Sequence, residues 1–201
     1  MYIPKYYQMH DYEEIKQFMR NNNFVTIITT DGVRPIATHL PVNIEEHSNV
    51  LYISGHFARG NKQWQTINNN DNILIIFHGP HGYVSSTWYE QEDVPTWDYE
   101  SIHTYGEGHL LNEEQLAVDL TKLLKQYEQH RENGATWDNL SDQTKKQIKG
   151  IVGFKIKVTN IEAAYKLSQT RSKQEKRNIA SQLNNSDNSM DHILADEIEK
   201  Q

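Results

Sequence analysis

The stretch GHFARGNKQW, residues 55–64, follows an apolar run and precedes a segment with helical character. It places a histidine, an arginine, two glycines and an asparagine where an expected strand ends. A strand that opens into a helix through glycines beside a guanidinium is one way to hold a phosphate, because backbone N–H groups and the guanidinium converge there. An ordinary turn with an exposed arginine fits the same residues, since short glycine-containing matches have little specificity.

Short apolar runs recur along the chain on both sides of this stretch. Residues 24–30 (FVTIITT) are β-branched and apolar, and the Asp-Gly pair that follows is a hairpin signal. Strands at regular spacing with few long helices between them are typical of a small barrel. We therefore predict a mainly β protein with flanking helices, of the α+β class. The expected strands are residues 24–30, 35–42, 50–54, 73–78, 101–111 and 152–161.

Two amphipathic helices accompany the expected strands. The first covers residues 11–22, with Asp11 as its N-terminal cap and its apolar residues on one face. The second covers residues 112–130, with Asn112 as its cap, and should cover part of the barrel or contact a partner. A weaker helix is expected at residues 141–150. The predicted apolar face of the second helix is Leu116, Leu120, Leu124 and Tyr127.

The size of the chain suits one domain with an appended tail. Its 201 residues are enough to bury a sizeable core. We assign residues 1–180 to the domain and residues 181–201 to a polar C-terminal tail that ends in a short helix. The tail is expected to be mobile or docked on a neighbouring subunit, because chain ends are poorly ordered unless something holds them.

The composition excludes several classes of chemistry. There is no cysteine, so disulfides, thiolate metal sites and cysteine nucleophiles are absent. The net charge of −7 argues against a broad nucleic-acid footprint, although a local basic patch can still act. No apolar run is long enough for a membrane span, and the N-terminus lacks the apolar centre of a signal peptide. We therefore expect a cytoplasmic protein without a membrane partner.

The common catalytic motifs are missing as well. The strand-rich half holds five histidines, but no two have the helical spacing of a zinc protease, so we predict no metal site. There is no G-x-S-x-G elbow, Walker loop or dinucleotide fingerprint. Serine hydrolysis, nucleotide hydrolysis and Rossmann-type dehydrogenation therefore lack support. The five histidines are His39, His56, His78, His81 and His103.

Aromatic and small residues dominate residues 77–106. Few aliphatic residues are present there to build a regular core, so we expect a loop. Its flat side chains with polar tips can wall a planar ligand or seal an interface. The alternative is that they only cap the end of the barrel. The aromatic residues include Tyr83, Trp88, Tyr89, Trp97, Tyr99 and Tyr105.

A basic cluster, residues 166–177, interrupts an otherwise acidic chain. A solvated helix face explains such a cluster without any function. Its functional alternatives are a phosphate contact by Lys166 or Arg171, or a local contact with DNA. The candidates for a DNA contact are Arg171, Lys173, Lys176 and Arg177.

Seven blocks in fixed order resemble the signature of a known family. From Met1 to about Arg177 the chain is similar to the FMN-binding negative transcriptional regulators, the PaiB-like proteins. That family is similar to the pyridoxamine-phosphate-oxidase-like group. The resemblance implies an FMN-binding split β-barrel, a homodimer with flavin at the subunit interface, and negative regulation of transcription. The blocks are MYIPKYY, ATHLPV, GHFARGNKQW, GPHGYVSSTWY, VPTWDYESIHTYG, IVGFKIKV and KLSQTRS.

The resemblance also assigns residues to the flavin. Arg59 would bind the phosphate, supported by Asn61 and the backbone near Ala58, because a guanidinium can donate two parallel hydrogen bonds to a phosphate. The other assigned residues fall into three sets. Thr38, His39, Leu40 and His56 would lie along the isoalloxazine ring; Tyr83, Trp88, Thr96 and Trp97 would close the pocket from the same subunit or its partner; Lys166 and Gln169 would complete it.

Four positions depart from the family pattern. Asp98 stands where asparagine is usual, and it matters most because a carboxylate near a reduced, anionic flavin would repel it. The other three are Gly60, Ser86 and Thr170, in place of alanine, proline and asparagine.

Three functions are open at this point. The first is an FMN-binding homodimer that represses transcription; since no helix-turn-helix is present, direct DNA binding would rely on the basic cluster. The second is a flavin-dependent oxidoreductase, NAD(P)H-linked or similar to pyridoxamine-phosphate oxidase, with His39 or His56 as a proton donor. The third is a flavin-free or haem-binding interaction module. The sequence alone does not decide whether the protein is an enzyme.

Overall fold

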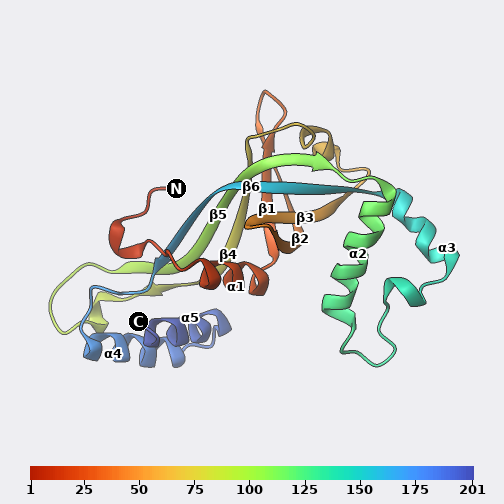
Figure 1. Cartoon of the computed structure of the whole chain (residues 1–201). Helices are drawn as coiled ribbons and strands as arrows, with labels where there is room; N and C mark the ends of the chain where they lie inside the picture. The colour runs from red at the N-terminus through yellow and green to blue at the C-terminus, as the bar shows by residue number, and fades with distance from the viewer. The chain divides into compact units, whose positions relative to one another are not determined.

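The computed structural model describes residues 1–201 and contains six strands that close into one barrel. The strand order is β1-β2-β3-β6-β5-β4, with antiparallel neighbours (Figure 1). The predicted β architecture with flanking helices is therefore confirmed. The strands are β1 (Phe24–Thr30), β2 (Pro35–His47), β3 (Val50–Ala58), β4 (Ile73–Val84), β5 (Thr96–Leu110) and β6 (Ile151–Lys166).

Helices connect or flank these strands. None of them is long and apolar enough to cross a membrane. The α-helices are α1 (Tyr12–Asn21), α2 (Glu113–Glu128), α3 (Asp142–Lys145), α4 (Lys173–Asn184) and α5 (Ser189–Glu199). The short 3-10 helices are η1 (Lys5–Tyr7), η2 (Lys62–Thr66), η3 (Ser86–Trp88), η4 (Trp137–Asn139) and η5 (Lys146–Gly150).

The chain divides into two compact units. Unit 1 consists of Met1–Phe18, His78–Ile102 and Glu162–Gln201. Unit 2 consists of Met19–Phe77 and His103–Ile161. Strands β4, β5 and β6 each contribute residues to both units.

Two hairpins form the first half of unit 2. β1 and β2 pair around the predicted Asp-Gly turn, where Gly32 has φ +88°. β2 and β3 pair around Ser48 and Asn49, which both have positive φ, as a two-residue primed turn requires. β2 therefore continues to His47, beyond its predicted end. β3 continues to Ala58 because it pairs with β6 along this length, so the first residues of GHFARGNKQW belong to the strand.

The two main predicted helices are present and capped as expected. α1 follows Asp11, whose Oδ1 accepts hydrogen bonds from the backbone N–H groups of Glu13 and Glu14 over 2.9 and 3.0 Å. α2 follows Asn112, which forms a complete capping box with Gln115. The apolar residues of α1 are buried as predicted: Ile15, Phe18 and Met19.

The buried face of α2 differs from the predicted one. Asp119 of this helix is buried because its carboxylate accepts hydrogen bonds from Asn43 and Ser54 in unit 2. This pairing turns α2 away from the predicted face, whose Tyr127 is 45% exposed. The predicted face was chosen from the spacing of apolar residues alone, and this criterion does not include a buried carboxylate such as that of Asp119. The buried residues of α2 are Leu116, Asp119 and Leu123.

The prediction of a loop over residues 77–106 is wrong. β4 and β5 extend into this segment, and only residues 85–95 lie outside these two strands. Gly82 shows how a segment with few aliphatic residues can still pack. A Cβ atom at Gly82 would lie 2.8 Å from Cδ2 of Leu194 in α5, so the missing side chain makes room for the helix. Packing from α5 supplies the apolar contact that the strand itself lacks.

The C-terminal residues that were expected to form a tail belong to a packed helical pair. α4 and α5 lie against each other in unit 1 (Figure 1). The predicted domain boundary at residue 180 falls inside α4. Apolar residues at helical spacing explain the packing, because both helices bury them. These residues are Ile179, Ala180, Leu183, Leu194, Ala195 and Ile198.

Candidate functional site

Arg59 lies in unit 2, directly after β3. Its backbone N–H donates to the carbonyl oxygen of Gly150 over 2.8 Å. Its guanidinium donates from Nε to the carbonyl oxygen of Lys149 over 2.7 Å, and from Nη2 to that of Ile151 over 3.0 Å. A guanidinium has five N–H donors. The protein uses two of them, so three remain for an anion at this exposed position.

Thr38 and Asn61 belong to one hydrogen-bond network. Nδ2 of Asn61 donates to Oγ1 of Thr38 over 2.8 Å, although the two residues are 23 positions apart. Thr38 in turn donates to Oε1 of Gln63 over 2.5 Å. Oδ1 of Asn61 accepts from the backbone N–H of Gln63 over 3.0 Å. The structure thus ties β2 to the turn that follows Ala58, whose carbonyl oxygen accepts from the backbone N–H of Asn61.

Gln63 is the central residue of this network, and the sequence analysis missed it. Its side chain is 1% exposed. Nε2 lies 3.1 Å from each of three acceptors, the carbonyl oxygens of Ile27 and Ile36 and Oγ1 of Thr29. Gln63 therefore locks β1 and β2 to η2. No sequence signal separates it from Gln65, which is exposed on the same short helix.

The predicted ring-contact residues on β2 have different surroundings. His39 is exposed, and its ring stacks on that of Phe24 in β1 with the centroids 6.5 Å apart. Leu40 is 5% exposed, so its side chain belongs to the core and only its backbone is available to a ligand.

His56 is half-buried on β3, and its Nδ1 is buried without a hydrogen-bond partner. Burial lowers the pKa of His56, and the negative charge of Asp119 opposes that shift. The imidazole is therefore neutral at pH 7. Oδ1 of Asp119 accepts from Asn43 over 3.0 Å and from Ser54, whereas its Oδ2 has no partner. Each of these two residues thus keeps one buried polar atom without a protein partner.

Lys166, at the end of β6 in unit 1, joins two other predicted residues. Its Nζ donates to the carbonyl oxygen of Trp97 over 2.6 Å and to Oγ1 of Thr96. It also lies 3.9 Å from Oδ1 of Asp98. An ammonium has three N–H donors, so Lys166 keeps one for a further acceptor.

Asp98 is fully buried in unit 1. Its Oδ2 accepts a hydrogen bond from Oγ of Ser168 over 2.6 Å, and its Oδ1 has no hydrogen-bond partner. Burial raises the pKa of Asp98, and this effect exceeds the opposing effects of the Ser168 hydroxyl, Lys166 and Arg171. A hydroxyl donor and a cation therefore accompany this buried carboxylate.

Gln169 is used by the turn after β6. Its Nε2 donates to the carbonyl oxygen of Tyr165 over 2.5 Å, and its Oε1 accepts from the backbone N–H of Leu167 over 2.8 Å. Its amide therefore stabilises the backbone of unit 1.

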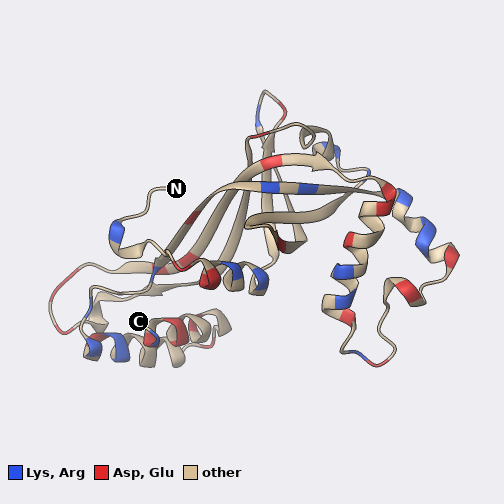
Figure 2. Cartoon of the chain, in the orientation of Figure 1, with Lys and Arg blue, Asp and Glu red and all other residues tan.

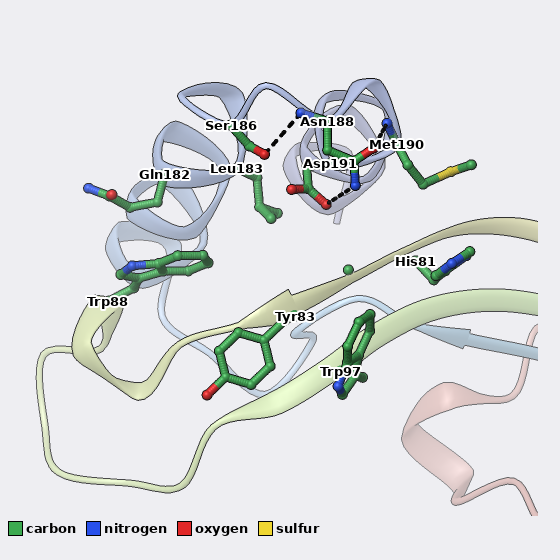
Figure 3. Close-up of a pocket in the computed structure, with 11 residues that line it drawn as sticks. His81, Tyr83, Trp88, Trp97, Gln182, Leu183, Ser186, Asn188, Met190 and Asp191 are labelled. Atoms are coloured by element: carbon green, nitrogen blue, oxygen red, sulfur yellow. Dashed lines mark hydrogen bonds between the residues drawn. The ribbon is translucent and has the colours of Figure 1, made fainter.

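Tyr83, Trp88 and Trp97 line one pocket in unit 1, with a volume of about 630 Å³ (Figure 3). The ring of Trp97 meets that of Tyr83 edge-on, with the centroids 6.1 Å apart. The ring of His81 lies 6.4 Å from Trp97 on the same pocket. Three of the predicted aromatic residues are thus brought together.

The four candidates for a DNA contact divide into two groups. Nη2 of Arg171 donates to Oδ2 of Asp93 over 2.7 Å, and its guanidinium carbon lies 3.6 Å from the ring centroid of Tyr89. Arg171 therefore makes contacts within unit 1. The other three lie in the first half of α4, which Figure 2 marks in blue, and line a cavity of about 450 Å³ together with the C-terminal Gln201. They are Lys173, Lys176 and Arg177.

Comparison with known proteins places the chain in a family. Residues 1–160 match the family described as "Putative FMN-binding domain". The chain is 46% identical over 206 aligned residues to the "Protease synthase and sporulation protein PAI 2" of Bacillus subtilis, with 100% of both chains covered. The chain belongs to the FMN-binding domain family. The resemblance found in the seven sequence blocks is therefore confirmed.

Solved structures with low sequence identity share the fold of this chain. The FAD and heme binding protein of Mycobacterium smegmatis aligns with a TM-score of 0.59 at 14% identity, over 79% of this chain and 73% of that one. The flavocytochrome Anf3 of Azotobacter vinelandii aligns with a TM-score of 0.58 at 13% identity, over 82% and 72%. These alignments confirm the predicted split β-barrel. The family match ends at residue 160, so α4 and α5 lie beyond it.

Proposed function

We propose that this protein is a cytoplasmic FMN-binding homodimer that acts as a negative regulator of transcription. Membership of the FMN-binding domain family supports the cofactor. The Bacillus subtilis relative is named for protease synthesis and sporulation, which supports a regulatory role.

The guanidinium of Arg59 is the observation on which FMN binding rests. Two backbone carbonyl oxygens hold it at 2.7 and 3.0 Å, and three of its N–H groups have no protein acceptor. An arginine oriented in this way loses little further freedom when it binds an anion. The residues present thus fit the phosphate of FMN.

The network around Thr38 suits the less charged part of the cofactor. Thr38 already accepts from Asn61 and donates to Gln63, so its hydroxyl is fixed in direction. In the proposed complex, this network orients the turn beneath the ribityl chain. Exposed His39 and the backbone of Leu40 contact the polar edge of the ring, with half-buried His56 in support. Bound FMN would supply electron or hydride transfer, which no side chain here provides.

A homodimer would let a partner subunit contribute the second wall of the flavin site. Phe24, whose ring stacks on that of the proposed ring contact His39, is 64% exposed. Aromatic side chains with this exposure favour an interface. Light scattering after size exclusion tests this part of the proposal, and a monomer at all concentrations would contradict it.

An FMN titration of wild type and Arg59→Ala, followed by visible absorption, tests the cofactor. We expect Arg59→Ala to weaken FMN binding by about ten- to a hundredfold, because a charge-assisted hydrogen bond contributes roughly 1.5–3 kcal/mol. Arg34→Ala is the matched control, since Arg34 is exposed in the turn between β1 and β2. If wild type bound no FMN, cofactor binding would be refuted. If both variants bound equally well, the phosphate would lie elsewhere.

Direct DNA binding is proposed through Lys173, Lys176 and Arg177. The probe is a labelled DNA duplex from the region upstream of the gene that encodes this protein. Replacing all three by alanine should weaken binding and reduce the slope of log affinity against log salt by roughly 3. The matched control replaces Lys145, Lys146 and Lys149, which removes the same charge from unit 2. Equal salt slopes for the two triple variants would contradict direct binding by α4.

A flavin-dependent oxidoreductase is the second candidate function. The aromatic pocket of unit 1 favours it, because about 630 Å³ is enough for a small organic substrate. FMN-dependent consumption of NAD(P)H by the purified protein would support it. Absence of turnover with common acceptors, alongside intact FMN binding, would favour the regulator.

A further inference from the structure

The aromatic pocket of unit 1 is lined by two parts of the chain. One part lies within residues 1–160, which match the FMN-binding domain family, and the other lies after residue 160. In Figure 3 the strand residues lie below the pocket, and the residues of α4, α5 and their connection lie above it. The lower side includes His81, Tyr83 and Trp97, and Trp88 lies at one end. The upper side belongs to the helical pair beyond residue 160.

Specific contacts hold the two sides of this pocket in place. Nδ2 of Asn178 in α4 donates to the carbonyl oxygen of Trp88 over 2.6 Å. The missing side chain at Gly82 lets β4 approach α5, where a Cβ would lie 3.0 Å from Oδ1 of Asp191. The pocket is therefore a built feature of unit 1, because both helices are tied to the strand side.

The charge of the pocket selects against anions. Of its lining residues, the only Asp, Glu, Lys or Arg is Asp191. Oδ1 of Asp191 accepts from Nδ2 of Asn188 over 3.2 Å, and its Oδ2 accepts no hydrogen bond from the protein. A phosphate or carboxylate in this pocket would find no Lys or Arg side chain to pair with and would be repelled by Asp191. The anionic end of FMN thus fits the Arg59 position and not this pocket.

The ring content of the pocket selects for flat ligands. The pocket is lined by four rings, whose faces can stack on planar molecules and attract cations. They belong to His81, Tyr83, Trp88 and Trp97. A volume of about 630 Å³ lies within the usual range for small-molecule sites. We propose that this pocket is a second ligand site, separate from the FMN phosphate site, for planar aromatic compounds that are neutral or positively charged. Tyr83, Trp88 and Trp97 then serve this ligand.

Three acridines of nearly equal size and different charge test the proposal by calorimetric titration. They are 9-aminoacridine, a cation at neutral pH, neutral acridine, and the anion acridine-9-carboxylate. We expect affinity to fall in that order, with no measurable binding of the anion. Trp97→Ala should weaken binding of the first two by about two- to tenfold, because a stacking partner is lost.

Asp191→Asn isolates the charge. This substitution should weaken the binding of 9-aminoacridine by about tenfold and leave the affinity for acridine unchanged, since the amide keeps the shape of the side chain and one acceptor oxygen. Asp196→Asn is the matched control, because Asp196 is exposed on the same helix and does not line the pocket. Circular dichroism of both variants checks that α5 is intact.

The titrations are done with and without saturating FMN, whose own binding is measured separately by absorption. We expect the same acridine affinity in both cases. Displacement of the acridines by FMN would mean that the pocket holds the flavin ring, and the proposal would be wrong. Failure of both neutral and cationic probes to bind, or equal binding of the anion, would also overturn it. A protein that binds acridines but not FMN would keep this inference and refute the proposed cofactor.

Discussion

The hydroxyl of Ser168 donates to Oδ2 of Asp98 over 2.6 Å in the interior of unit 1. Burial raises the pKa of Asp98 above its ordinary value of 3.8, in spite of this hydrogen bond and of Lys166 at 3.9 Å. The folded state therefore binds the proton of Asp98 more tightly than the unfolded state. Its stabilising contribution is complete below pH 3.8 and is lost as the pH rises through the raised pKa.

Asp98→Asn should flatten the pH dependence of the unfolding free energy in this range, because the amide does not titrate. Ser168→Ala should act in the opposite direction: without the hydroxyl donor, the pKa of Asp98 rises further and the dependence becomes steeper. Urea unfolding over a series of pH values measures both. Identical pH profiles for wild type and Asp98→Asn would show that the burial of this carboxyl has no energetic effect.

Glu100→Gln should change stability at higher pH. Burial, together with the charges of Glu197 and Glu14, raises the pKa of Glu100 to about 8, although Lys200 opposes the shift. Stability from the protonated form is complete below pH 4.5 and is lost as the pH passes through about 8. Above that pH we expect Glu100→Gln to be more stable than wild type by a few kcal/mol. Thermal unfolding measures this, with exposed Glu199→Gln as the control; an unchanged melting temperature at alkaline pH would contradict it.

Gln63→Ala should destabilise unit 2. It removes the donor to the carbonyl oxygens of Ile27 and Ile36 and to Oγ1 of Thr29, which keeps its hydrogen bond from Thr66; losing the contacts of this buried amide costs about 1–3 kcal/mol before relaxation. It also releases Thr38, so FMN affinity should fall at temperatures where the variant is folded. Gln65→Ala on the same short helix is exposed and should be neutral. Equal unfolding free energies for the two variants would refute the central role of Gln63.

Gly82→Ala should separate α5 from β4. The added Cβ would lie 2.8 Å from Cδ2 of Leu194, which is fully buried, and 3.0 Å from Oδ1 of Asp191. Overpacking of this kind costs about 1–3 kcal/mol. Gly60→Ala is the control, because nothing lies within 4 Å of a Cβ there. Chemical denaturation should find Gly60→Ala neutral or slightly stabilised; a similar loss in both variants would refute the packing argument.

Local signals in the sequence predicted much of the fold. Alternating and β-branched residues placed the strands, and Asp11 and Asn112 placed the starts of α1 and α2, because caps and turns depend on near neighbours. Ordered blocks predicted the FMN-binding domain family that the comparisons confirm. The same local reasoning failed for residues 77–106, where Gly82 and α5 make a strand out of an expected loop.

The candidate site was only partly accessible from the sequence. Arg59, Thr38 and Asn61 were named from the resemblance, and a hydrogen bond joins the last two. Gln63 could not be singled out, since its importance comes from acceptors on β1 and β2. Asp119 had a signal that was overlooked: it lies three residues after Leu116 and four before Leu123, on one helical face.

The sequence by itself determined the strands, the main helices and the family, because each follows from residues close together in the chain or from blocks in fixed order. The tertiary structure alone decided that Asp119 is buried together with Leu116 and Leu123, through a contact with Asn43 76 positions away. It also decided that α4 and α5 close a pocket over aromatic residues of β4 and β5. Such features depend on which distant groups meet, and a buried polar group finds its partner only when the chain has folded.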